Sequence, residues 1–241
     1  MADPDSDTHS DADTGTARRV NPRSARGMRT RAALVRAARE VFERDGYLDA
    51  RIADITTTAG VAAGSFYTYF VNKEEIFTAV VAQVQEEMLH PNLRQRTGIT
   101  DPRELISAAN REYLRAYRKN ARLMAVFEQV AQIDEDFRAL RVKRGDAFAQ
   151  RNARMIRELQ RAGLADAALD PLVTAHALSS MVSRMAYLVY VSGQRIPFER
   201  LAGTLDRLWE NGLRLRPPDT GPEEAGPDEA GPEDAGPAGG R

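Results

Sequence analysis

The sequence contains no cysteine, one tryptophan and three histidines in 241 residues. The lack of cysteine excludes disulfide bonds, thiolate metal sites and cysteine nucleophiles. The histidines (His9, His90 and His176) are far apart, and neither an HExxH pattern nor a glycine-rich phosphate loop accompanies them. So little catalytic material argues against an enzyme, and we predict neither a metal site nor a cofactor.

Long apolar runs are also missing. No run reaches the roughly 18 residues that a membrane-spanning helix needs. The first residues, MADPDSDTHSDADTGTARRV, are acidic and lack the apolar stretch of a secretory signal. We therefore expect a soluble, cytoplasmic protein with no membrane partner.

The formal net charge of −1 hides a strong separation of charge along the chain. Residues 1–17 carry five aspartates and no basic residue, and residues 217–241 carry seven acidic residues and one arginine. The part between them, 18–216, holds 33 basic and 23 acidic residues, a net charge of +10. A basic body indicates a polyanionic partner, although charge alone is weak evidence.

Both ends of the chain have the composition of disordered segments. Residues 217–241 repeat GPEEA, GPDEA, GPEDA and GPAGG, which cannot bury a core. We predict a disordered arm over residues 1–25 and a disordered acidic tail over 217–241. Two interpretations stay open for these ends: solubilising linkers, or acidic segments that compete with DNA for the basic body.

Between the ends, the apolar spacing is helical and no alternating strand pattern stands out. Apolar residues recur every three or four positions in RTRAALVRAAREVFERDG, RIADITTTAG and KEEIFTAVVAQVQEEML. Asp101-Pro102 and Asp170-Pro171 predict helix starts, and Pro197 opens a last helix. We expect Gly193 and Gly212 to end the last two helices. The sequence therefore predicts an all-α protein of about nine helices.

The segment around residue 60 has the pattern of a helix-turn-helix motif. Gly60 permits the left-handed backbone of a tight turn between two short helices, the second of which begins near Ala62. Phe66 and Phe70 are four residues apart and should face the core. Gly64, Ser65, Tyr67 and Thr68 should face outward, with Tyr69 at the margin, and tyrosine hydroxyls can reach DNA phosphates.

The stretch GYLDARIADITTTAGVAAGSFYTYFVNKEEIFTAV resembles the N-terminal domain of the tetracycline-repressor (TetR) family of bacterial regulators. The resemblance covers about residues 29–80 without a gap. It implies a three-helix DNA-binding domain over residues 26–72, followed by a larger helical ligand-binding and dimerisation domain over 73–216. The signals are Gly46-Tyr47, Asp54-Ile55, Ala59-Gly60-Val61, Gly64-Ser65-Phe66-Tyr67, Tyr69-Phe70 and Asn72-Lys73-Glu74.

By position, the resemblance implies that Tyr67, Tyr69 and Lys73 hold DNA phosphates. Arg51 lies where the family often has a hydroxyl residue, so we expect a charged phosphate contact there; the alternative is an ordinary solvated arginine.

The sequence departs from the family at Ala62, Ala63 and Gly64, where many members have a Ser or Thr cap and a polar residue. These positions offer no hydrogen bonds to bases, so readout should depend on Ser65, Thr68 and Arg51, with methyl contacts from the alanines to thymine.

Six arginines and no acid lie between residues 18 and 31, in ARRVNPRSARGMRTR. We hypothesise that this arm, which includes Arg29, reads a minor groove. The alternative is a flexible basic leader that only raises nonspecific affinity.

Helices over 170–192 and 197–213 are the predicted dimer surface, because small residues such as Ser179 and Ser183 allow close approach. In the resembling family these helices form a four-helix bundle with their copies. Trp209 could anchor that bundle or the core.

The family usually keeps an apolar cavity among its middle helices, here over 102–163. Candidate lining residues are apolar or aromatic side chains of that region and three polar or aromatic side chains of the next helix. Each of them could also be an ordinary core residue. A single histidine such as His176 is more often buried and hydrogen-bonded within the protein than in contact with a ligand. The candidates are Tyr113, Tyr117, Phe127, Phe148, Met155, His176, Arg184 and Tyr187.

Together these features predict a homodimeric repressor that binds a palindromic DNA operator and is released by a small apolar effector. Activation instead of repression is an alternative that the sequence does not decide.

 The population of DNA-binding states would shift as the effector binds, through the helix over 73–89. The alternative is an architectural or protein-controlled DNA binder without a small-molecule effector.

Overall fold

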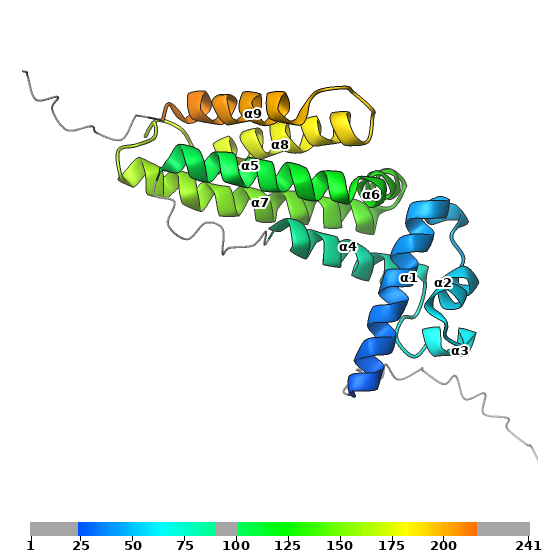
Figure 1. The fold of residues 1–241 in the computed structure, drawn as a ribbon. Coiled ribbons are helices and arrows are strands. Elements are labelled where there is room, and N and C mark those ends of the chain that lie inside the picture. The colour runs from blue at the N-terminus through cyan, green and yellow to red at the C-terminus, as the bar shows by residue number, and fades with distance from the viewer. Residues whose placement is uncertain (1–23, 90–100, 216–241) are drawn as a thin grey trace, which may run out of the picture.

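The computed structural model describes residues 24–89 and 101–215, which form nine helices and no strand (Figure 1). The all-α prediction is therefore confirmed for the described residues. The helices are α1 (Ala25–Asp49), α2 (Ile52–Ala59), α3 (Ala63–Phe66), α4 (Lys73–Leu89), α5 (Pro102–Lys119), α6 (Ala121–Ile133), α7 (Glu135–Arg161), α8 (Pro171–Tyr190) and α9 (Phe198–Leu213).

The nine helices form two groups that α4 connects. Figure 1 shows α1, α2 and α3 at one end, with α5, α7, α8 and α9 stacked lengthwise at the other. The helix α4 packs on α1 and continues toward α5, and α6 also packs on α1. The small N-terminal group is therefore fixed directly to the larger helical body.

Helix α1 follows the predicted apolar spacing and is interrupted at Gly46. Leu34, Ala38 and Phe42 are fully buried. Gly46 has φ 78° and ψ 177°, a non-helical backbone that separates the long helix from a last turn. The positive φ favours glycine at this position.

The predicted helix starts are confirmed, and one predicted stop is wrong. The Asp101 carboxylate accepts a hydrogen bond from the Arg103 N–H at 2.9 Å, and Asp170 accepts from the Val173 N–H at 2.8 Å. Gly212 lies inside α9 rather than ending it. The left-handed cap falls on Arg214 instead, with φ 50°, and its N–H bonds back to the Asn211 carbonyl.

An aromatic cluster joins the two groups of helices. The ring centroids of Phe77 (α4) and Phe137 (α7) are 5.1 Å apart, and those of Phe42 (α1) and Phe77 are 4.9 Å apart. The Tyr47 ring lies 5.9 Å from Phe137. Because aromatic pairs at these distances are stabilising, the cluster couples the start of α7 to α1 and α4.

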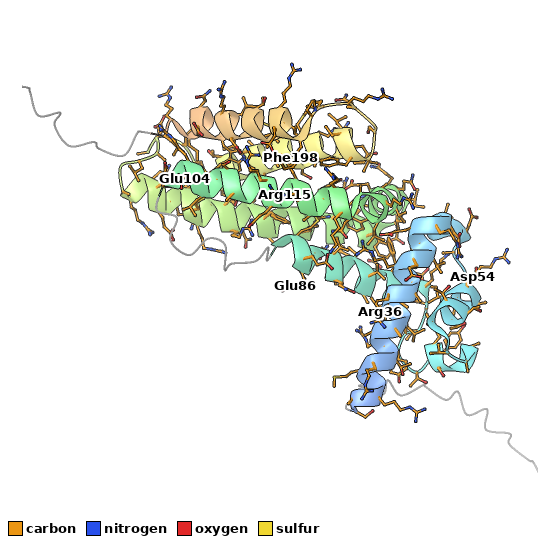
Figure 2. All side chains as sticks on the ribbon, viewed as in Figure 1. Arg36, Asp54, Glu86, Glu104, Arg115 and Phe198 are labelled. Atoms are coloured by element: carbon orange, nitrogen blue, oxygen red, sulfur yellow. The ribbon has the colours of Figure 1, made fainter. Side chains whose placement is uncertain are left out.

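The C-terminal helix packs along α5. Figure 2 shows Phe198, at the start of α9, beside Arg115 of α5. The guanidinium carbon of Arg115 lies 5.4 Å from the Phe198 ring centroid. Farther along α9, the buried Asp206 carboxylate accepts hydrogen bonds from Ser107 and Asn110 of α5 at 2.8 and 2.9 Å.

Some predictions concern residues that the structure does not describe. The acidic tail over 217–241 and nearly all of the arm over 1–25 lie outside the described ranges. Among the described helices, none is long and apolar enough to cross a membrane. Within 24–89 and 101–215, no three His, Asp or Glu side chains gather as a metal site would require.

Candidate DNA-binding surface and ligand cavity

The turn between α2 and α3 has the geometry that the sequence predicted. Gly60 adopts a left-handed backbone with φ 66° and ψ 34°, and its N–H donates to the Thr57 carbonyl at 3.1 Å. The Val61 N–H donates to the Thr56 carbonyl at 3.0 Å. These bonds close α2 and turn the chain into α3, which is the arrangement of a helix-turn-helix motif.

The start of α3 is exposed and uncapped. Ala62 is the N-cap residue and makes no side-chain capping bond, as its side chain dictates. Ala62, Ala63 and Gly64 are exposed, and Ser65 is half-buried. The first turn of α3 therefore presents methyl groups and backbone to any DNA groove that it enters.

The aromatic residues of α3 and of the turn that follows it divide between core and surface as predicted. Phe66 and Phe70 are buried, whereas Tyr67 is 58% exposed. Thr68 is exposed and Tyr69 is half-buried. The exposed phenol and hydroxyl groups lie on the same short segment as the exposed start of α3, so one surface carries both.

Two predicted DNA-contacting arginines are exposed in the N-terminal group of helices. Arg29 is exposed in the second turn of α1, and Arg51 is the exposed N-cap residue of α2. The neighbouring Arg31 is partly committed elsewhere, because its guanidinium carbon lies 5.0 Å from the Phe70 ring centroid.

Lys73 occupies a different place from the one that the family resemblance implied. Its ammonium group donates to the carbonyls of Tyr47, Leu48 and Ala50 at 2.8, 3.1 and 3.2 Å. It also lies 4.7 Å from the Tyr47 ring centroid. Because an ammonium has three N–H donors, a phosphate contact by Lys73 would require it to leave these carbonyls.

A cavity of about 660 Å³ lies in the larger group of helices. Its lining comes from α5, α6, α7, α8 and α9. Seven of the eight side chains that the sequence analysis nominated are in this lining: Tyr113, Tyr117, Phe148, Met155, His176, Arg184 and Tyr187.

Phe127 was nominated wrongly. It is fully buried on α6 and does not line the cavity. The helical spacing of α6 shows that a residue faces inward, but it cannot separate a core position from a cavity wall. Trp209 was expected in the core or in a dimer bundle; it is 3% exposed and lines the cavity.

The two polar candidates on α8, His176 and Arg184, are more exposed than residues of a closed, buried ligand site would be. The side chain of His176 is 44% exposed, and its Nε2 atom lies 3.8 Å from an Asp146 carboxylate oxygen. It is therefore not the buried, satisfied histidine that its type favoured. Arg184 is exposed, with its guanidinium carbon 5.2 Å from the Tyr187 ring centroid.

The most buried charged residue of the cavity wall is not among the residues predicted from the sequence. Arg144 of α7 is 9% exposed and lines the cavity. Its Nη1 atom is 3.2 Å from the Met124 sulfur, and its Nη2 atom is 3.0 Å from the Met88 sulfur. A signal was present in the sequence, because Arg144 lies seven residues after Phe137 and four before Phe148, on the apolar face of α7.

Other polar side chains in the lining bond to one another. The Asn152 amide donates to the Ser179 hydroxyl at 2.9 Å, and the Glu128 carboxylate accepts from Arg141 at 3.1 Å. Burial raises the pKa of the Tyr113 phenol, and the nearby Arg144 cation opposes that rise. The cavity is thus mixed in character, with aromatic walls and a polar side.

The N-terminal group of helices matches a known protein family. Residues 34–80 match the model of the family described as bacterial regulatory proteins, tetR family. A transcriptional repressor of Pseudomonas putida, NicS, is 29% identical over 89 residues, which are 37% of this chain and 42% of that protein. The match therefore spans less than half the length of that curated relative.

Alignments of this chain with solved structures of similar fold extend over nearly the whole length of those structures. A transcriptional regulator from Saccharomonospora viridis in complex with choline aligns with a TM-score of 0.66 at 19% identity, over 76% of this chain and 96% of that one. The fatty acid degradation regulator FadR of Bacillus halodurans has the same TM-score and identity, over 78% of this chain and 97% of its own. The helix-turn-helix domain, matched over residues 34–80, is therefore that of the TetR family of bacterial regulatory proteins.

Proposed function

We propose that the protein is a DNA-binding transcriptional repressor whose affinity for a palindromic operator falls when a small, largely apolar molecule enters the cavity. The observation that carries this proposal is the direct packing of a cavity-bearing helical body on a helix-turn-helix domain. Neither part alone would suggest regulation by a ligand.

The exposed surface of α3 supports DNA binding. Tyr67 and Thr68 can donate to phosphate oxygens, while the first turn of α3 can approach base edges. The exposed Arg29 and Arg51 add positive charge to the same group of helices. Such phosphate contacts would make affinity fall steeply as the salt concentration rises.

Dimerisation through α8 and α9 supports specificity, because one helix-turn-helix reads too few base pairs by itself. Leu172 and Val173 of α8 are 43% and 67% exposed, and Leu208 of α9 is 44% exposed. Apolar side chains on two neighbouring helices offer a surface that a second copy would cover.

The cavity supports a small-molecule effector. Its volume lies within the range of about 300–1,000 Å³ that ligand sites occupy. The protein from Saccharomonospora viridis was solved with choline, so a fold of this kind can hold a small molecule. The aromatic and methionine side chains of the wall suit a largely apolar body.

Coupling between the cavity and the DNA surface would run through α4 and α7. The lining contains no residue of α4, so a ligand in the cavity would have to act on α4 through a residue of the cavity wall. Arg144, on the cavity wall, makes this connection, because its Nη2 atom bonds to the sulfur of Met88 near the end of α4. A ligand that favours one position of α4 would change operator affinity by its differential binding.

Selection of bound DNA from a random pool, combined with sizing of the complex, tests this proposal. We expect one palindrome, with half-sites about one helical turn apart, bound by a dimer. Enrichment of no sequence, together with salt-sensitive binding, would favour the architectural alternative. That alternative draws on the exposed Ala62, Ala63 and Gly64, which offer no side-chain hydrogen bonds to bases.

A further inference from the structure

Arg144 is a buried cation whose two terminal nitrogens bond to sulfur atoms. Its two terminal nitrogens contact the thioethers of Met124 and Met88, which are weak acceptors. Among the described residues, no carboxylate forms an ion pair with Arg144; the only acidic residue of the described lining, Glu128, pairs with Arg141 instead. Burying a charge without a strong partner is costly, so proteins usually pair such groups.

The position of this cation gives it access to the cavity. Arg144 forms part of the wall together with Tyr113 and Phe148. From this geometry we propose that the effector carries an oxyanion head, such as a carboxylate, that Arg144 binds, and an apolar body that fills the aromatic side. The inference rests on the proposed function and specifies the chemical class of its effector.

The charges around the cavity agree with an anionic ligand. Four arginines line it, against one acidic side chain, Glu128. Glu128 is already engaged, because its carboxylate accepts a hydrogen bond from Arg141 at 3.1 Å. A negative head group would therefore meet an excess of positive charge near Arg144.

A second donor on the wall is unused. Among the described residues, the buried Nε1 atom of Trp209 has no hydrogen-bond partner, although a buried tryptophan usually finds one. The neighbouring Asn110 amide donates to Asp206 at 2.9 Å and so is occupied. Trp209 thus contributes to the wall a buried polar atom that no described protein group satisfies.

Binding of the anion at Arg144 would also act on α4. The Nη2 atom that contacts the Met88 sulfur at 3.0 Å is one of the donors that a carboxylate would take. Charge-assisted bonds to carboxylates are much stronger than bonds to thioethers. The ligand would thus compete for the contact that holds the end of α4 against α7.

Two dyes of one skeleton test the inference on the full chain. The anionic 8-anilinonaphthalene-1-sulfonate and the neutral N-phenyl-1-naphthylamine differ by the sulfonate, and both brighten in apolar sites. We expect the wild-type protein to bind the anionic dye at least tenfold more tightly. R144M should reduce that preference to less than threefold while leaving affinity for the neutral dye unchanged.

Two further variants serve as controls. R154M removes an exposed arginine from the same helix and should keep the wild-type preference. R144K retains the charge and should keep part of it, and dodecanoate should displace the anionic dye from wild-type protein better than dodecanol. R144M should also unfold at the same or a higher temperature, since it removes a poorly paired buried charge.

Three results would overturn the inference. Equal affinity of wild-type protein for both dyes would do so while leaving the cavity, and the proposed function, intact. An unchanged preference in R144M would assign the anion to another site. Failure of both dyes to bind would remove the effector from the proposed function as well, whereas operator selection would still test DNA binding.

Discussion

The Lys73 ammonium nitrogen lies 2.8 Å from the carbonyl oxygen of Tyr47, at the junction between α1 and α2. Two more carbonyls, of Leu48 and Ala50, accept from the same group. The first residue of α4 therefore ties down the segment that ends α1 and leads into α2. That segment determines where α2 and α3 lie. Lys73 therefore positions the DNA-binding surface through hydrogen bonds to the backbone that leads into it.

Replacement of Lys73 by methionine should destabilise the protein by about 1–3 kcal/mol, because three carbonyls lose a charged donor. Chemical denaturation monitored by circular dichroism measures the loss. Lys119→Met is the matched control, since Lys119 is exposed and makes only a surface ion pair with Glu87 at 3.3 Å. Equal stability of both variants would contradict the role given to Lys73.

Gly60→Ala should destabilise the protein by about 1–2 kcal/mol, because Gly60 has φ 66° and alanine avoids that backbone. No atom lies within 4 Å of the added methyl group, so the cost is one of conformation alone. Gly64→Ala is the control: it has equal space and no positive φ, and should be neutral or stabilising. Thermal unfolding of both variants decides the matter.

Ala62→Ser should stabilise the protein by about 0.5–1 kcal/mol, because it supplies the capping bond that α3 lacks. Ala63→Ser, one residue into the helix, should give no such gain. The denaturation midpoints of the two variants provide the comparison, and a gain in both would show that capping is not the cause.

Alanine substitutions at Phe127 and Phe148 should show by their loss of stability which residue lies in the core and which lies on the cavity wall. Phe127→Ala should cost about 3–5 kcal/mol, as for a fully buried aromatic residue. Phe148→Ala should cost less, because one side of its ring already faces the cavity. Denaturant unfolding measures both changes, and a larger loss for Phe148 would contradict its place on the wall.

Much of the helix-turn-helix domain could be predicted from the sequence because its determinants are local. Gly60 needs its backbone conformation whatever surrounds it, and Phe66 and Phe70 share a face by spacing alone. Asp101 and Asp170 cap their helices for equally local reasons. Such features depend on neighbours within one or two turns of the chain.

The cavity depended on contacts between distant segments, and there the sequence was less informative. Phe127 and Phe148 have similar spacing, yet only the packing of α6 against α7 and α8 determines which of them meets open space. Arg144 reads as a surface arginine until Met88, 56 positions away, is placed beside it. Lys73 likewise matched a phosphate contact by position, whereas the fold turns its ammonium toward α1.

Tyr67→Phe should weaken operator binding several-fold without changing stability, because the phenol hydroxyl is lost from a side chain that is 58% exposed. A single hydrogen bond to a charged phosphate is worth about 1.5–3 kcal/mol at most, which bounds the loss. Fluorescence anisotropy with the selected operator measures affinity at several salt concentrations. Tyr190→Phe, on α8 and far from α3, is the control and should bind DNA as the wild type does. If both variants bound equally well, the exposed hydroxyl of α3 would have no part in the DNA contact, and the phosphate would have to be held by the neighbouring Thr68 or Arg51.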